Sequence, residues 1–170
     1  MSPVVVRSYR PSDHAAGRDL WSELTHQHHR MYGTPSAKGD DGGAGFEEYL
    51  TRLDLSGLWV ADHADDGVIG LVGLVMRGRA GEVEPIVVSA SHRHKGVGRK
   101  LLRHVADEAK KRNMISLTIS PESRNVDAIR SLHAAGYDVV SSIELTLDLD
   151  RHPHDWQSDS LELHELQFRS

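Results

Sequence analysis

The chain has 170 residues, 38% of them hydrophobic and 26% charged, and a formal net charge of −5. This length suits one domain with a substantial core, and the acidic balance does not favour nucleic acid as a partner. The absence of cysteine excludes disulfides, thiolate metal sites and a cysteine nucleophile. The sequence shows neither a signal-peptide pattern nor an apolar run of about 20 residues, so we expect a cytoplasmic protein without a membrane partner.

Histidine is unusually frequent, with twelve residues in the chain. The closest groups are His26, His28 and His29, then His92 with His94, and His152 with His154. None of these spacings matches the helical His-Glu-x-x-His arrangement of zinc proteases. We therefore expect solvated histidines and no metal.

The first third of the chain predicts one strand and two helices. The β-branched run at residues 4–9 is typical of a strand, and the polar turn at residues 11–13 can cap the helix that follows. Apolar residues recur at helical spacing over residues 14–32 and again over residues 46–53. Between these helices, residues 33–45 include five glycines and form either a plain connector or a substrate lid.

The middle third predicts an antiparallel meander. Residues 58–61 and 68–76 form two apolar strands, joined by a turn with an aspartate–glycine pair at residues 66–67. A second glycine turn, at residues 78–81, leads into a third strand that begins near Val83.

A basic, glycine-containing turn follows that strand, with the pattern Arg93-x-x-Gly96-x-Gly98. Residues 93–99, which we call the anion loop, lead into an amphipathic helix that ends near Asn113. The glycines let the backbone turn tightly and let a ligand approach it closely. Unpaired N–H groups and the positive end of the helix dipole attract anions. The pattern therefore predicts a phosphate or pyrophosphate site.

Two common nucleotide motifs do not fit the anion loop. A Walker loop requires Gly-Lys-Ser/Thr, whereas this chain has Gly98-Arg99-Lys100. A dinucleotide fingerprint requires a third glycine at the position of Leu101. From the residues alone, the remaining alternative is a structural turn that contains two glycines.

The last third predicts a parallel strand, a helix and a final pair of strands. Residues 115–119 alternate in polarity, and the helix before them makes a crossover, so this strand should run parallel to the strand before the anion loop. A short helix at residues 125–135 ends at Gly136. Two strands are expected after it, at residues 137–140 and 143–149.

The chain shows no internal repeat and no second domain. We expect a single domain at residues 1–150 and a polar C-terminal extension at residues 151–170. The few apolar residues of this extension suit an edge strand or a dimer contact, and both a monomer and a homodimer are open.

The segment from Ile86 to Gly98 resembles the acyl-coenzyme A signature of the GNAT superfamily of N-acetyltransferases. The family pattern, Arg/Gln-x-x-Gly-x-Gly/Ala, begins five residues after a strand valine, and here Arg93 follows Val88 at that spacing. The second conserved block of the family is matched by Asn125-x-x-Ala128-Ile129 and Gly136-Tyr137. The resemblance implies an α/β (α+β) fold whose mixed central sheet of about seven strands contains a splayed parallel pair and is flanked by about four helices.

The resemblance also implies acetyl-coenzyme A (acetyl-CoA) as cosubstrate. Backbone N–H groups of residues 94–99 would hold the pyrophosphate, and the strand before the loop would bind the pantetheine arm like an added strand. Asn125 and the helix after it would line the other side of the arm. The cofactor-binding residues implied in this way are Ile86, Val87, Val88, Arg93, His94, Lys95, Gly96, Val97, Gly98, Arg99, Asn125 and Ser131.

A carboxylate near the thioester can act as general base for a protonated amine. Because side chains alternate along a strand, Glu82 and Glu84 should share a face with Ile86 and Val88. Glu84, four residues before Val88, matches the acidic position of many family members and is the predicted base, with Glu82 a weaker candidate. The plain alternative is an edge carboxylate that only attracts a cationic substrate.

The chain departs from the family pattern at Leu132. Many family members carry a tyrosine there, which serves as general acid toward the leaving thiolate, and leucine donates no proton. We predict an N-acetyltransferase that moves an acetyl group from acetyl-CoA to a primary amine by direct attack in a ternary complex. A small-molecule acceptor is favoured over a protein. The alternative is a non-catalytic acyl-CoA-binding sensor or regulatory module.

Overall fold

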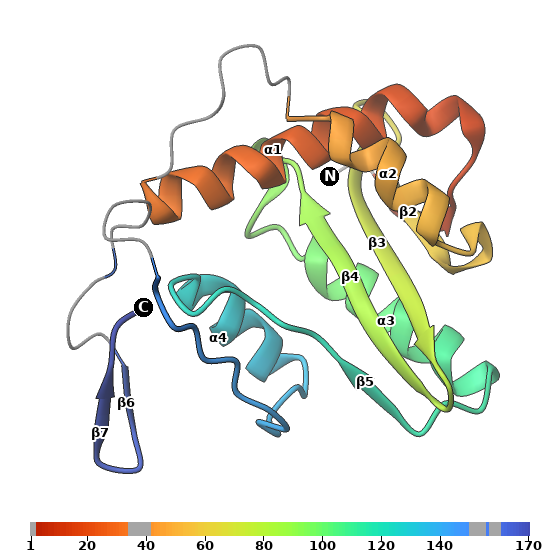
Figure 1. Ribbon diagram of the computed structural model, residues 1–170. Helices are drawn as coiled ribbons and strands as arrows, with labels where there is room; N and C mark the ends of the chain where they lie inside the picture. Colours follow the sequence, from red (N-terminus) through yellow and green to blue (C-terminus); the bar gives the residue numbers. More distant parts are fainter. Residues whose placement is uncertain (1–2, 34–41, 150–155, 157–160) are drawn as a thin grey trace. The chain divides into compact units, whose positions relative to one another are not determined.

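Figure 1 shows the computed structural model of the chain, which describes residues 3–33, 42–149, 156 and 161–170. Residue contacts divide the chain into two compact units, Met1–His26 with Gly39–Ser120, and Gln27–Lys38 with Pro121–Ser170. No helix in the described ranges is long and apolar enough to cross a membrane.

Parts of the chain to which the sequence analysis assigned a role lie outside the described residues. They are residues 34–41 of the loop at residues 33–45, and residues 151–155 and 157–160 of the extension at residues 151–170. The expected domain boundary near residue 150 also falls there and stays a prediction.

The first unit contains a five-stranded sheet in the order β1-β2-β3-β4-β5. Its strands are β1 (Val4–Ser8), β2 (Leu58–His63), β3 (Gly67–Arg77), β4 (Ala80–Val88) and β5 (Ser116–Thr118). The first four strands pair antiparallel, and β5 pairs parallel with β4 (Figure 1). The predicted meander and the predicted parallel crossover are both confirmed.

Three helices accompany this sheet: α1 (His14–Tyr32), α2 (Ala44–Arg52) and α3 (Val97–Lys111). The direction in which two glycines of β3 face shows where these helices lie. A side chain added at Gly73 would meet Tyr49 of α2, whereas one added at Gly70 would meet Leu101 of α3. Strand residues three apart lie on opposite faces of a sheet. The helices α2 and α3 therefore cover opposite faces of β3.

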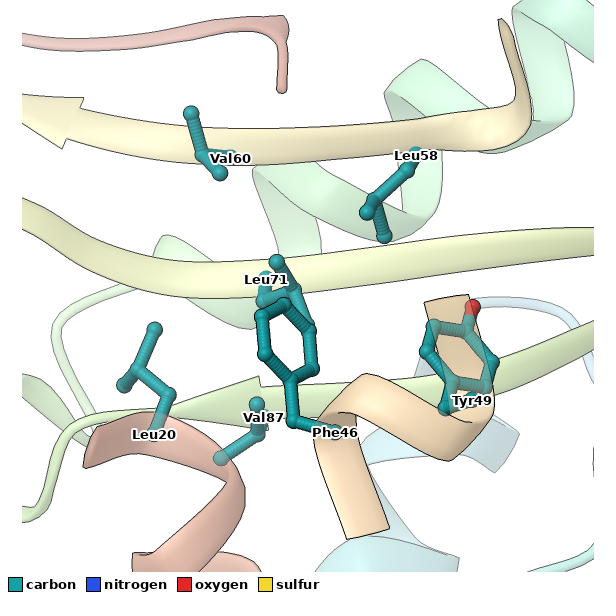
Figure 2. Packing of buried hydrophobic residues seen from close by; sticks show 7 residues of the cluster. All are labelled: Leu20, Phe46, Tyr49, Leu58, Val60, Leu71 and Val87. Atoms are coloured by element: carbon teal, nitrogen blue, oxygen red, sulfur yellow. The ribbon is translucent and has the colours of Figure 1, made fainter. Parts of the chain in front are cut away.

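The core on the α2 face is built mainly from large apolar side chains. Leu20 of α1 and Phe46 and Tyr49 of α2 pack against Leu71 and Val87 of the sheet (Figure 2). Phe46 is completely buried. Burying such a side chain contributes about 1.5–3 kcal/mol, so this cluster fixes α2 on the sheet beside the middle of β4.

A buried carboxylate secures the turn between β1 and α1. Asp13 accepts hydrogen bonds from the Arg7 guanidinium at 2.7 Å and from the Arg10 N–H group at 2.8 Å. The Arg7 bond, more than any other cause, holds the pKa of Asp13 below its ordinary value. Asp13 therefore fastens the 3-10 turn (Pro11–Asp13) that leads into α1, and the capping of α1 itself by residues 11–13 stays a prediction.

The second unit contains α4 (Val126–Ala134) and a hairpin of β6 (Leu161–Leu163) and β7 (Leu166–Phe168). Arg124 links its segments, because the guanidinium donates to the Met31 carbonyl at 2.6 Å and lies 4.9 Å from the centre of the Tyr32 ring. The predicted helix at residues 125–135 is confirmed, and Gly136 after it has the expected positive φ of 100°.

The two strands expected at residues 137–140 and 143–149 are wrong, since this segment has no strand in the structure. Its apolar side chains are open to solvent, with Val139 81% and Leu147 81% exposed. Alternating polarity suits a strand, but a strand forms only where a neighbour supplies hydrogen bonds. The main sheet consequently has five strands in the described residues, against the seven expected.

Candidate functional site

The strand β4 is paired on both sides over only part of its length. Its parallel partner β5 reaches from Ala80, opposite Ser116, to Glu82, opposite Thr118. Beyond Glu82, no described strand pairs with that edge, so β4 and β5 splay apart there. The free edge over residues 83–88 can pair with an extended ligand. The splayed parallel pair expected from the sequence is confirmed.

A β-bulge marks the point where the splay begins. In the antiparallel register Val72 lies opposite Ile86, and Leu74 lies opposite Val83. Glu84 and Pro85 therefore both oppose Gly73 on β3, which is the two-against-one arrangement of a bulge. Bulges of this kind bend a strand and redirect its side chains, and they are frequent beside active sites.

The bulge also changes which side chains share a face. Glu82 is paired with Val75, and Ile86 is paired with Val72. Paired residues lie on the same face, and residues three apart on β3 lie on opposite faces. Glu82 therefore lies on the face opposite to Ile86 and Val88. The expectation of one shared face is wrong, because strict alternation does not continue through a bulge.

Tyr49 of α2 holds the bulge through a hydrogen bond to its main chain. Its hydroxyl donates a hydrogen bond to the Glu84 carbonyl at 2.6 Å, and its side chain is 3% exposed. Gly73 leaves the necessary space, since a Cβ atom there would lie 1.9 Å from the Tyr49 hydroxyl oxygen. Burial raises the pKa of Tyr49, and the negative charge of Glu84 raises it further. The Glu84 carboxylate thus lies near the phenol while remaining exposed.

The residues after β4 are held in a defined turn. The Arg93 guanidinium donates to the Val88 carbonyl at 3.0 Å and lies 3.8 Å from the Glu23 carboxylate of α1. The same carboxylate accepts a hydrogen bond from the Ala90 N–H group at 2.9 Å. Arg93 and Glu23 therefore shape the start of the anion loop.

The anion loop presents backbone N–H groups at the start of α3. Gly96, with φ of 83°, is the N-cap of α3 and has no side-chain capping bond. The first helical hydrogen bond runs from the Lys100 N–H group to the Gly96 carbonyl at 3.1 Å. The N–H groups of residues 97–99 precede this bond and have no acceptor within the helix. They can bind an anion with the help of the helix dipole.

Side chains around these N–H groups leave room for a ligand. His94, Lys95 and Arg99 are exposed, whereas Val97 is buried and anchors the loop. A Cβ atom at Gly98 would touch only Val88, at an ordinary distance of 3.9 Å. The protein's own packing would therefore allow a side chain at position 98. A glycine at such a position is expected where a ligand needs the space.

Two of the predicted cofactor-binding residues belong to the second unit. Asn125 is the N-cap of α4, and its side-chain oxygen accepts from the Ala128 N–H group at 3.2 Å. Ser131 is exposed on the same helix, and Leu132 is buried at 7% exposure. Asn125 thus has a clear structural role, and its contact with a cofactor, like that of Ser131, stays a prediction.

Two contributors were missed by the sequence analysis. Tyr49 reads as one more apolar position of a short helix, and Glu23 as a polar position of a long one. Their partners Glu84 and Ala90 are distant in the sequence, so no local pattern could have revealed either contact. A hydroxyl on an otherwise buried helix face was the only available signal.

A mixed sheet that opens beside a bulge, with an anion loop at the end of the same strand, is the architecture of an acyltransferase. Comparison with known proteins makes this specific. Residues 18–137 match the model of the acetyltransferase (GNAT) family. The chain belongs to this family.

Individual relatives agree with this assignment. The chain is 33% identical over 101 residues to a streptothricin acetyltransferase of Streptomyces lavendulae, a match that covers 58% of this chain and 53% of that relative. It therefore spans about half the length of this curated relative.

Solved structures share the fold at low identity. A GNAT-family acetyltransferase from Staphylococcus aureus MU50 has a TM-score of 0.64 and 16% identity, covering 86% of this chain and 95% of that one. The structure of AAC(6')-Iy with the bisubstrate analogue CoA-S-monomethyl-acetylneamine has a TM-score of 0.63 and 18% identity, covering 86% and 99%. The expected GNAT fold is confirmed.

Proposed function

We propose that this protein transfers an acetyl group from acetyl-CoA to a primary amine by direct attack in a ternary complex. The observation that carries the proposal is the order of features along β4. Glu84 lies at the bulge, the free strand edge extends over residues 83–88, and the anion loop follows at residues 93–99. This order matches the thioester, the pantetheine arm and the pyrophosphate of one extended cofactor.

Backbone groups would provide most of the cofactor contacts. The amide groups of the arm would pair with the free edge of β4 at Ile86, Val87 and Val88. The N–H groups of residues 94–99 would hold the pyrophosphate, with Lys95 and Arg99 able to add charge at the exposed rim. Contacts of Arg93 and Glu23 already hold the start of the anion loop in place. The loop would therefore lose little conformational entropy when the cofactor binds.

Glu84 would act as general base for the acceptor. Its carboxylate takes a proton from the ammonium group, directly or through one water molecule, and the free amine attacks the thioester carbonyl. A β4 N–H group would stabilise the oxyanion. The new N–C bond forms, the nitrogen gives its second proton to water, the C–S bond breaks, and coenzyme A leaves as a thiolate that takes up a proton from water. Leu132 supplies no acid, and a thiolate needs little assistance near neutral pH.

The acceptor is proposed to be a small cationic amine. Glu84 is an exposed anion beside a buried tyrosine, which favours a positively charged substrate. The name of the curated relative indicates streptothricin as its substrate, and AAC(6')-Iy was solved with an analogue that contains acetylneamine. Both names point to small molecules.

The decisive test compares Glu84→Gln with Glu82→Gln in a thiol-release assay over a panel of amines. We expect Glu84→Gln to lower kcat by about 10²–10⁴-fold, with calorimetric affinity for acetyl-CoA unchanged. Glu82→Gln lies in the paired part of β4, where Glu82 makes an ion pair with Arg77, and should behave as the unchanged protein. Equal turnover in both variants would remove Glu84 from the mechanism.

A second function has one observation in its favour, the buried Leu132 where a proton donor is usual. This is the sensor that binds acyl-CoA without turnover. Tight binding of acetyl-CoA and no thiol release with any amine would establish it. Failure to bind acetyl-CoA at all would contradict both functions.

A further inference from the structure

Three side chains of metal-ligand type meet where the β2–β3 hairpin turns. His63 ends β2, Asp66 lies in the turn, and His92 belongs to the short 3-10 helix (Ala90–His92) just before the anion loop. One ligand atom from each lies within 4.8 Å of the other two. The Asp66 Oδ2 atom is 3.1 Å from His63 Nδ1 and 3.0 Å from His92 Nε2. All three belong to the first unit.

The cluster is enclosed on one side and open on the other. The side chains of His63 and His92 are only 16% and 15% exposed, whereas that of Asp66 is 54% exposed. The imidazole rings lie 5.4 Å apart between centroids. Two partly buried imidazoles are therefore held in place beside a solvent-accessible carboxylate, which leaves an open position for water.

The contacts of His63 require positive charge beside the Asp66 carboxylate. Its Nδ1 atom accepts from the backbone N–H groups of Asp65 at 3.3 Å and Asp66 at 3.2 Å, so it carries a lone pair. The same atom lies 3.1 Å from a carboxylate oxygen of Asp66, which also carries only lone pairs. The two atoms attract each other only when positive charge lies between them, carried either by a proton on Nδ1 or by a metal ion that takes this lone pair in place of the two N–H groups.

His92 is oriented for the same purpose. Its Nδ1 atom lies 2.9 Å from the hydroxyl oxygens of both Ser89 and Ser91. When Nδ1 donates its proton to a serine oxygen, the lone pair of Nε2 points toward Asp66. Metal-binding histidines are usually fixed by such an outer hydrogen bond on the second ring nitrogen.

We propose that His63, Asp66 and His92 bind one Zn²⁺ ion, with water as the fourth ligand. Two imidazole nitrogens, one carboxylate oxygen and a water form a tetrahedral zinc set, with metal–ligand distances of about 2.0–2.2 Å. Donors at such distances stand roughly 3.3 Å from one another, close to the 3.0 and 3.1 Å separations already present around Asp66.

The ion has a structural role in this proposal. His92 directly precedes Arg93, so the ion would tie the hairpin turn to the first residue of the anion loop. The sequence alone favoured solvated histidines, because His92 is far from His63 in the chain and no spacing motif links them.

Zinc titration of the metal-stripped full-length protein, in competition with a chromophoric chelator, tests the proposal. We expect one site whose affinity falls by at least about 100-fold in Asp66→Asn and in His92→Ala. The double variant Ser89→Ala, Ser91→Ala keeps all three ligands but removes both outer hydroxyl partners of His92, and it should lower affinity by about tenfold, the smaller effect typical of an outer partner. His133→Gln, an exposed histidine on α4, controls for zinc bound by other histidines and should change nothing.

Cobalt substitution gives a second readout that is independent of affinity. The unchanged protein should show the visible absorption of four-coordinate Co²⁺, and Asp66→Asn should lack it while keeping the same circular dichroism spectrum. The proposal is overturned if Asp66→Asn and His92→Ala bind zinc as tightly as His133→Gln does, or if their cobalt spectra match that of the unchanged protein.

Discussion

The two halves of β4 differ in how they are paired, although they belong to one strand. Residues 80–82 have β3 on one side and β5 on the other, whereas residues 83–88 have only β3. The first half is an ordinary interior strand. The second half offers a free edge that suits a ligand. The change between these roles occurs at the bulge of Glu84 and Pro85, which places the proposed base at the boundary.

The difference shows how one strand can serve stability and binding together. The paired half is fixed by hydrogen bonds on both edges. The splayed half has a strand on one edge only and needs other contacts to stay ordered. The hydrogen bond from Tyr49 to the Glu84 carbonyl and the packing of Val87 in the core provide these contacts. Four substitutions can test this difference in support.

Gly73→Ala should break the junction between the two halves. Its Cβ atom would lie 1.9 Å from the Tyr49 hydroxyl and 2.3 Å from the Glu84 carbonyl oxygen, and the latter is a backbone atom that cannot move alone. We expect a loss of about 3 kcal/mol of unfolding free energy, the upper end of overpacking effects, measured by urea denaturation. Gly78→Ala, where no atom lies within 4 Å of the added Cβ, should lose only about 1–2 kcal/mol from its positive φ.

Gly98→Val should weaken binding without weakening the fold. The new side chain would occupy the space in which the cofactor phosphates are proposed to lie, and valine is no worse than glycine in a helix. We expect at least a tenfold loss of acetyl-CoA affinity, about 1.4 kcal/mol, by calorimetry. The midpoint of urea unfolding should stay the same. Asp107→Val, exposed later on α3, should leave the affinity unchanged, and a similar loss there would mean that Gly98 has no special role.

Tyr49→Phe should loosen the splayed half while the paired half stays intact. It leaves the Glu84 carbonyl without its hydrogen bond from α2, which typically costs about 1 kcal/mol. Urea denaturation should show this loss, and amide hydrogen exchange should speed up at residues 83–88 more than at residues 80–82. Equal acceleration in both halves would contradict the proposed division.

Glu82→Gln should have the smallest effect. Glu82 makes an ion pair with Arg77 at 3.1 Å, and the Arg77 side chain is 67% exposed. Exposed pairs of this kind contribute about 0–1 kcal/mol. We expect a change in unfolding free energy below about 0.5 kcal/mol and no change in turnover. A large fall in turnover would favour Glu82 as the base and contradict the role proposed for Glu84.

Local patterns predicted the features that local interactions determine. The limits of α1 follow from apolar periodicity, and the positive φ of Gly136 follows from its place after a helix. The parallel pairing of β4 and β5 follows from the crossover rule. These elements were predicted from the residues alone. The residues of the anion loop predicted a phosphate site, and the family resemblance made coenzyme A the expected ligand.

Features that depend on distant partners could not be predicted. A regular strand would place Glu82, Glu84 and Ile86 on one face, and the pairing with β3 shows that a bulge at Glu84 and Pro85 breaks this order. Pro85 was a local signal of such an irregularity, because proline within sheets is confined to edges and bulges. The contacts of Tyr49 and Glu23 join residues that lie far apart in the chain. Residues 143–149 alternate as a strand should, yet nothing in their sequence supplies the neighbour that a strand requires.

The hydrogen bond from Tyr49 ends on the backbone of residue 84 and not on its side chain. The main-chain shape of the bulge is therefore independent of which amino acid occupies this position. Evolution or an engineer can exchange the functional group at residue 84 without redesigning the scaffold that presents it. Acceptor preference can thus drift at this one position, while the surfaces proposed for the cofactor are inherited unchanged.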